Sequence, residues 1–272
     1  MFVNGVVEVA GCPLAYKVVG EGPPVVFLQG VGLHGDGWLP QTEVLRARYR
    51  CVTVDNRGIG LSKPVGAALS IDRMAKDTLA VMDALGIAEA HLVGHSMGGA
   101  ICLQTALIAR ERIKSLALTC TSAKGSDSVT ISSKLLGLTI RGHIGPLRTR
   151  NDAYLEIIMP DSYLATVDRV ALAARLKPLF GHELAELPPI ASPQLFALVR
   201  YNAAPQVHKL AGIRPLAISA AEDFLFPPKR GKALAAGIPG ARYLEFPNAA
   251  HGLPMQCPEL YNRALEEHLA AG

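Results

Sequence analysis

The chain has 272 residues, of which 50% are hydrophobic and 18% are charged, and its formal net charge is +4. That length suits one compact domain with room for an inserted segment, and the apolar content supplies a large core and excludes a disordered chain. Lysines and arginines are scattered rather than clustered, so nucleic acid is not expected as a partner.

Cysteine spacing and the N-terminal residues favour a cytoplasmic protein. The five cysteines are odd in number, irregularly spaced and without a CxxC pair, which predicts neither a zinc site nor a disulfide framework. The first residues lack the basic start and unbroken apolar stretch of a secretion signal. Residues 92–109 carry no Asp, Glu, Lys or Arg, but the glycines and polar residues among them favour a strand, a turn and a helix over a membrane span.

Short apolar runs alternate with helical periodicity in the first half of the chain. The apolar runs predict strands at 6–10, 14–19, 25–28, 51–54, 91–93 and 116–119. The helical periodicity predicts helices at 42–48, 71–85 and 97–110. Strands that alternate with helices at this spacing indicate a parallel sheet with crossover helices.

This alternation stops near residue 123 and resumes after residue 207. The stretch between has no strand pattern and carries helix-like pieces interrupted by glycines and prolines. Strands are then predicted at 216–219 and 242–246, and helices at 229–236 and 259–269. The predicted fold class is therefore α/β, with a mostly parallel, doubly wound sheet built from 1–123 and 208–272 and a helical insertion at 124–207.

A G-x-S-x-G motif supplies the candidate nucleophile. Gly94-His95-Ser96-Met97-Gly98 lies between a predicted strand and a predicted helix, which is the context that the motif requires. The turn is so tight that its flanking positions must be glycine, and it raises Ser96 beside the positive end of the helix.

Two further residues complete a candidate catalytic triad. A serine hydroxyl needs a base that takes its proton, and that base needs an orienting acid. Asp223 follows the strand at 216–219, and His251 follows the strand at 242–246. The chain order Ser, Asp, His, with each residue after a strand, matches the order expected for this motif. Asp127, after the strand at 116–119, is the alternative acid.

An oxyanion hole requires two backbone N–H groups aimed at the developing negative charge. Met97 N–H, directly after the nucleophile, is the first expected donor. The second should come from the loop after the strand at 25–28, and because that strand ends at Leu28 we expect Val31 N–H. His34-Gly35, a few residues later, is the alternative turn.

Together these residues resemble the α/β-hydrolase superfamily over nearly the whole chain, from the strand at 25–28 to the last helix. The segment DNRGIGLS at 55–62 is similar to a D-x-R-G-x-G-x-S segment common in that family, and we assign it a structural role. Related enzymes usually have His-Gly where this chain has Gln29-Gly30. The resemblance implies an α/β-hydrolase fold and a lid over the site, formed by the insertion at 124–207.

The expected activity is the cleavage of carboxylic esters through an acyl-enzyme, without a metal or an organic cofactor. The apolar residues of the insertion favour small to medium, largely apolar substrates. A lactonase, a C–C bond hydrolase and a cofactor-free perhydrolase use the same triad, and a ligand receptor without turnover is the alternative outside catalysis. A small-molecule ester or lactone is the expected partner, no membrane contact is expected, and a homo-oligomer is compatible with the sequence.

Overall fold

The structure is a computed structural model that describes residues 2–128 and 133–271. The described residues form one eight-stranded sheet in the order β1-β2-β4-β3-β5-β6-β7-β8. The strands are β1 (Val3–Val9), β2 (Cys12–Val19), β3 (Pro24–Leu28), β4 (Arg50–Val54), β5 (Ala90–His95), β6 (Ile113–Thr119), β7 (Pro215–Ala220) and β8 (Arg242–Phe246). Pairing is antiparallel from β1 to β4 and parallel across the rest of the sheet, so the predicted fold class is confirmed.

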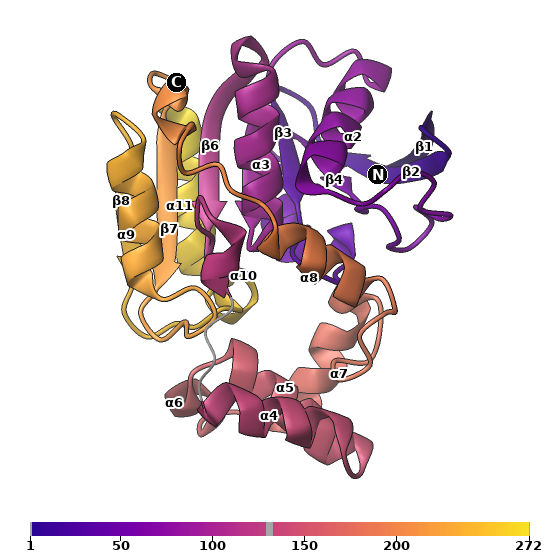
Figure 1. Ribbon diagram of the computed structural model, residues 1–272, viewed down its shortest axis with the longest axis vertical. Coiled ribbons are helices and arrows are strands. Elements are labelled where there is room, and N and C mark those ends of the chain that lie inside the picture. Colours follow the sequence, from indigo (N-terminus) through magenta and orange to yellow (C-terminus); the bar gives the residue numbers. More distant parts are fainter. Residues whose placement is uncertain (1, 129–132, 272) are drawn as a thin grey trace.

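Helices cover both faces of this sheet (Figure 1). One face packs against α2 (Ile71–Ala84), α3 (Met97–Ile108) and α9 (Pro228–Gly237). The other face packs against α1 (Leu39–Leu45) and α11 (Pro258–Ala270), while the short α10 (Leu253–Gln256) precedes α11. No helix in the described parts of the chain combines the length and the apolarity needed to cross a membrane.

Strand β3 shows why the central strands are continuous apolar runs. Val26 and Leu28 belong to the core cluster on one face, and Val25 and Phe27 belong to the cluster on the other. All four side chains are fully buried. A strand covered on both faces needs apolar residues at every position rather than at every second one.

The helical insertion lies between β6 and β7. It contains α4 (Ser133–His143), α5 (Leu147–Ile158), α6 (Asp161–Leu164), α7 (Arg169–Phe180) and α8 (Ala191–Val199). Figure 1 shows α4 to α7 as a layer beyond one end of the sheet. The neck of the insertion is the place where the chain leaves the sheet and returns to it. There Lys124 pairs with Asn202 in an isolated antiparallel bridge. Residues 129–132, which the predicted insertion contains, lie outside the described residues.

The first helix differs in position from its prediction. The pattern predicts a helix at 42–48, whereas α1 begins at Leu39 and ends at Leu45. Pro40 occupies the first turn of α1, where its missing N–H leaves no hydrogen bond unmade and its fixed φ suits the helix. The predicted helix begins too late in the chain because the apolar periodicity alone does not take account of a proline in the first turn.

The five cysteines all carry free thiols, as their number and spacing predicted. Cys12, Cys51, Cys102 and Cys120 are buried. Burial raises the pKa of Cys51 to about 12. A thiol that stays protonated behaves as a small apolar side chain, so these residues contribute to packing.

Two of the buried histidines lie outside the predicted site. His91 on β5 and His268 on α11 are 4% and 3% exposed. Burial, and secondarily the positive charge of Arg214, lowers the pKa of each imidazole to about 4. His91 Nδ1 lies 2.7 Å from Ser115 Oγ, which satisfies one ring nitrogen without a charge.

These histidines should make the protein sensitive to acid. In the unfolded chain an imidazole binds its proton near pH 6.5, so below that pH the unfolded state binds more protons than the folded state. The free energy of unfolding should therefore fall as the pH drops from about 6.5 to about 4, by roughly 3 kcal/mol for each histidine. Urea unfolding of the wild type and of His268→Asn, measured at several pH values between these limits, tests this expected fall.

The variant should show a clearly shallower fall in unfolding free energy than the wild type. His208→Asn is the matched control because His208 is exposed, and it should keep the wild-type slope. Identical slopes for the wild type and His268→Asn would contradict the prediction.

Candidate active site

Ser96 occupies the tight turn between β5 and α3 that the sequence motif predicted. Its backbone has φ 55° and ψ −119°, a sparsely populated region for a residue with a side chain. A Cβ on Gly98 would overlap the carbonyl oxygen of Leu28, so only glycine fits there. The turn leaves Ser96 at the N-terminus of α3 and 7% exposed.

Asp223 and His251 are in direct contact. His251 Nδ1 donates to Asp223 Oδ2 at 2.8 Å, and the two residues are 7% and 2% exposed, respectively. Asp223 Oδ1 accepts the backbone N–H groups of Leu225 and Phe226, both at 2.9 Å. The Phe226 ring stacks on the imidazole, with centroids 5.9 Å apart. These contacts fix the tautomer that carries its proton on Nδ1 and leaves Nε2 able to accept one.

The alternative acid lies in a different environment. Asp127 Oδ1 forms an ion pair with Arg230 Nη1 at 3.1 Å. Glu222, adjacent to Asp223 in the sequence, is exposed. Of the three carboxylates, only Asp223 contacts His251 among the described residues.

Ser96 directly follows His95, whose ring lies against the imidazole of His251, with centroids 4.8 Å apart. Within the described residues no hydrogen bond joins Ser96 Oγ to His251, a gap that free enzymes often close only when substrate binds. His95, which precedes Ser96, donates from Nε2 to the carbonyl oxygen of His251 at 2.7 Å. Burial and the nearby His251 lower the pKa of His95 to about 3, so it stays neutral. The sequence analysis assigned His95 no role, and its motif position was the only signal.

The loop after β3 passes directly over the serine. A Cβ built on Gly30 would lie 3.6 Å from Ser96 Oγ. The amides on either side of Val31 are occupied, since Gly30 N–H donates to Gln29 Oε1 and Gly32 N–H donates to Gln194 Oε1. Among the described residues, the N–H groups of Val31 and of Met97 donate to no protein acceptor. These are the two amides that the sequence analysis selected for the oxyanion hole.

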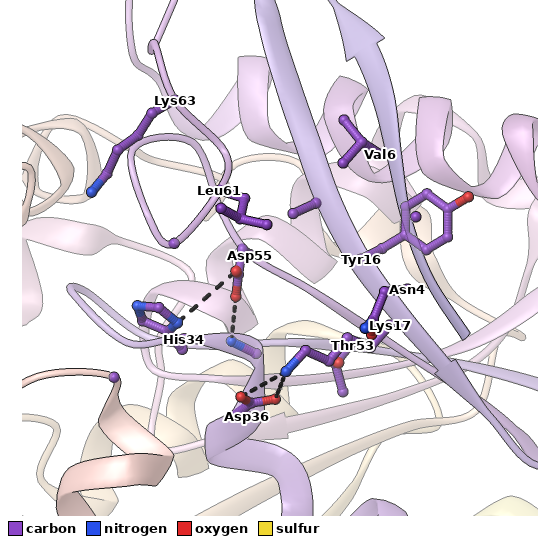
Figure 2. Close-up of a pocket in the computed structure, with 15 residues that line it drawn as sticks. Asn4, Val6, Tyr16, Lys17, His34, Asp36, Thr53, Asp55, Leu61 and Lys63 are labelled. Carbon is purple, nitrogen blue, oxygen red and sulfur yellow. Dashed lines mark hydrogen bonds and ion pairs between the residues drawn. The ribbon is translucent and has the colours of Figure 1, made fainter. Parts of the chain in front are cut away.

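The far end of the same loop is held by Asp55, as Figure 2 shows. Asp55 Oδ1 accepts Gly35 N–H at 2.7 Å, and Asp55 Oδ2 lies 4.0 Å from His34 Nδ1. Since the Gly35 amide is already bonded, the alternative oxyanion turn at His34-Gly35 is disfavoured. The cavity drawn there, of about 750 Å³, is lined by the β1–β2 hairpin and the outer side of this loop, not by Ser96, Asp223 or His251.

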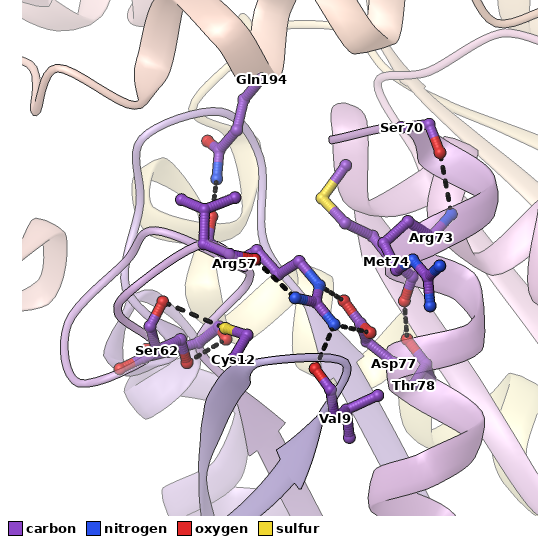
Figure 3. A network of polar contacts seen from close by, with 12 residues as sticks. Val9, Cys12, Arg57, Ser62, Ser70, Arg73, Met74, Asp77, Thr78 and Gln194 are labelled. Atoms are coloured by element: carbon purple, nitrogen blue, oxygen red, sulfur yellow. Dashed lines mark hydrogen bonds and ion pairs between the residues drawn. The ribbon is translucent and has the colours of Figure 1, made fainter. Parts of the chain in front are cut away.

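Arg57 anchors the DNRGIGLS segment to the core (Figure 3). Its fully buried guanidinium contacts the Asp77 carboxylate at 2.5 and 2.7 Å. It also donates to the backbone carbonyls of Val65 at 2.6 Å and Val9 at 2.7 Å. A buried arginine with this many charge-assisted hydrogen bonds fixes the backbone around it, which agrees with the structural role predicted for this segment.

The helical insertion contacts both the loop that carries His251 and the loop over Ser96. Gly252 N–H, adjacent to His251, donates to the carbonyl oxygen of Ile158 on α5 at 2.7 Å. Gly32, in the loop over Ser96, is bonded to Gln194 on α8, and its carbonyl oxygen lies 3.2 Å from His182 Nε2. The sequence analysis missed Gln194, whose signal was a buried amide side chain within a mostly apolar helix.

Several apolar side chains of the insertion are exposed rather than packed against the core. Leu136, Ile140 and Phe196 are 59%, 51% and 62% exposed, so they do not line an enclosed pocket. Buried members of the insertion pack together with Leu33 of the loop over Ser96 and with Met255, close to His251. The insertion therefore reaches the site mainly through this packed cluster.

One group of potential metal ligands occurs among the described residues. His95, Cys120 and His251 each place one ligand atom within 4.8 Å of the others. Burial, with the charge of Asp223 next in effect, raises the pKa of the Cys120 thiol, which disfavours the thiolate that a metal binds. His95 Nε2 and His251 Nδ1 already have oxygen partners. The expectation of metal-free chemistry stays a prediction.

Relatives and solved structures resemble this chain over nearly its whole length, and a family model matches part of it. A family model described as alpha/beta hydrolase fold matches residues 23–144. A relative from Mycobacterium tuberculosis, named as non-heme bromoperoxidase BpoC, is 30% identical over 265 residues, which are 95% of this chain and 98% of the relative. One from Azorhizobium caulinodans, named as carbamate hydrolase RutD, is 30% identical over 93% of each chain. The solved enol-lactonase of Burkholderia xenovorans LB400 superposes with a TM-score of 0.81 at 26% identity and covers 97% of this chain and 99% of its own.

Proposed function

Because this chain belongs to the α/β-hydrolase family, we propose that it is a serine hydrolase that cleaves carboxylic esters of small to medium, largely apolar substrates. Ser96 is the nucleophile, His251 the base and Asp223 the orienting acid. The observation that carries the proposal is the buried hydrogen bond between Asp223 and His251. It leaves Nε2 of the imidazole able to accept a proton, and His251 contacts His95, the residue directly before Ser96.

The reaction proceeds in two steps. Ser96 Oγ attacks the ester carbonyl carbon while its proton passes to His251 Nε2, and Asp223 stabilises the resulting imidazolium through Nδ1. The tetrahedral oxyanion accepts hydrogen bonds from the N–H groups of Val31 and Met97. The C–O bond then breaks, and the alcohol leaves with the proton from His251. Water then attacks the acyl carbon while His251 takes its proton, the bond to Ser96 Oγ breaks, and His251 returns the proton to Ser96 Oγ as the acid leaves.

The insertion at 124–207 acts in this proposal as a lid over the site. Its backbone contact through Ile158 and its side-chain contact through Gln194 attach it beside the base and beside the oxyanion loop. Excluding water from a site strengthens hydrogen bonds to a developing charge. The lid therefore serves the chemistry as well as substrate selection.

A lactone is the second candidate substrate. The enol-lactonase named above matches this chain over nearly its whole length, and a lactone is an internal ester open to the same two steps. In that case the leaving hydroxyl stays attached to the acyl group, and the released product is a hydroxy acid. Two relatives are named as a bromoperoxidase and a carbamate hydrolase. Peroxide-dependent chemistry and carbamate hydrolysis are therefore alternative activities to ester cleavage.

A panel of p-nitrophenyl esters, from acetate to long acyl chains, tests the proposal together with a set of simple lactones. We expect steady multiple turnover of at least one ester, with an optimum at a short or medium acyl chain. Rapid acid quenching followed by peptide mass analysis should find the acyl group on Ser96. A single turnover would indicate a ligand receptor, and an acyl group on another residue, or no turnover at all, would contradict the proposal.

A further inference from the structure

We infer that Gln194 of the helical insertion is a positioning residue for the oxyanion hole. This inference rests on the proposed serine-hydrolase function, because it concerns the loop that presents Val31 N–H. Gln194 is fully buried on α8. It lies 162 positions along the chain from the loop residue that it contacts, Gly32.

The Gln194 amide joins two backbone segments. Its Oε1 accepts Gly32 N–H at 2.8 Å, and its Nε2 donates to the carbonyl oxygen of Arg57 at 3.1 Å. A primary amide has one acceptor end and one donor end, and here each end faces its complement. Rotating the amide by 180° would place N–H against N–H and oxygen against oxygen, so both contacts select a single orientation.

The Arg57 end of this connection is rigid. Figure 3 shows Gln194 above the Arg57 carbonyl, with the Arg57 side chain held below by Asp77 and by Val9. Because the guanidinium is fully buried and ion-paired, the carbonyl to which Gln194 donates has a fixed position. The amide transmits that position to Gly32 across two hydrogen bonds.

The Gly32 end sets the direction of the neighbouring amide. Val31 and Gly32 are linked by one peptide plane, so fixing Gly32 N–H also fixes the carbonyl of Val31 and limits rotation of its own N–H. His182 holds the other side of Gly32, at its carbonyl oxygen. Gly32 has φ +79°, a region in which glycine has little intrinsic preference for one conformation. External hydrogen bonds are therefore needed to keep Val31 N–H aimed at the oxyanion.

Gln194→Met tests this inference, because methionine has a similar volume and makes neither hydrogen bond. Displacing an oxyanion donor without removing it should lower kcat about 10- to 100-fold, with KM within about threefold of the wild type. The discriminating readout is inhibitor affinity. A boronic acid that matches the best acyl chain forms a tetrahedral adduct on Ser96 and occupies the hole, whereas the alcohol product carries no oxyanion and does not.

Affinity for the boronic acid should fall by the same factor as kcat, and affinity for the alcohol product should not change. Gln104→Met is the matched control, because it is the same substitution at a glutamine whose Nε2 donates to Asp72 Oδ1 on α2 rather than to the oxyanion loop. It should keep kcat within twofold. Wild-type kcat and boronic acid affinity in Gln194→Met would overturn the inference, and so would equal losses of affinity for both inhibitors.

A second variant covers the case in which Gln194→Met does not fold. In Gln194→Glu the carboxylate still accepts Gly32 N–H, but only its protonated form can donate to Arg57. The ratio of variant to wild-type kcat should therefore rise as the pH falls from 8 to 6, and a ratio of one throughout would overturn the inference. A wild type that neither hydrolyses esters nor binds the boronic acid would overturn the proposed function, and the inference with it.

Discussion

Replacing Ser96 by alanine should lower kcat for the best ester about 10⁶-fold and abolish formation of the acyl-enzyme. The variant keeps the turn, the base and both proposed oxyanion donors, but it has no oxygen to attack the carbonyl. Residual hydrolysis should be the slow attack of water assisted by the remaining groups. Initial rates at saturating p-nitrophenyl ester, with a fluorophosphonate probe to detect the nucleophile, measure both effects.

Ser70→Ala provides the control for Ser96→Ala. Ser70 caps the N-terminus of α2 by accepting Arg73 N–H, so its loss should reduce stability by about 1 kcal/mol and leave kcat unchanged. If Ser96→Ala kept wild-type turnover, another residue would be the nucleophile. If Ser70→Ala lost activity as severely, the assay would be reporting stability.

Replacing Asp223 by asparagine should lower kcat about 10⁴-fold. Asparagine retains an oxygen for the N–H groups of Leu225 and Phe226, so the loop should keep its shape. The amide nitrogen that then faces His251 is a donor, so it favours the tautomer with the proton on Nε2. That tautomer cannot take the proton of Ser96. Single-turnover kinetics with the best ester separate this loss in acylation from substrate binding.

Asp127→Asn is the matched control for Asp223→Asn. It removes a carboxylate that is also near a strand end but pairs with Arg230. Its kcat should stay within about twofold of the wild type, because a partly exposed ion pair contributes little. A large loss in Asp127→Asn combined with a small loss in Asp223→Asn would reverse the assignment of the acid.

The sequence predicted the features that depend on local pattern. Apolar runs located the strands, and the glycines around Ser96 located the sharp turn because no other residue fits beside Leu28. Parallel strands bring their carboxyl ends to one edge of a sheet, so Asp223 and His251 were expected to lie near each other. Their hydrogen bond agrees with that expectation.

Contacts between distant segments were beyond the reach of sequence patterns. The sequence marked Arg57 as structural but gave no sign that Asp77 is its partner, since the pairing depends on how α2 packs beside the DNRGIGLS segment. His95 and Gln194 were missed for the same reason. Each acts through a backbone carbonyl or amide of a residue more than a hundred positions away, and a backbone group leaves no trace in the residue type.

The closed neck of the insertion has a consequence for how such enzymes diversify. Gly125 N–H donates to the Tyr201 carbonyl and Ala203 N–H donates to the Ala123 carbonyl on either side of the Lys124–Asn202 bridge. The segment leaves the core and returns to it at one point, between neighbouring strands. A gene segment that encodes a different set of helices can therefore be exchanged there without re-pairing the sheet. Recombination at this junction offers new substrate ranges on an unchanged catalytic core.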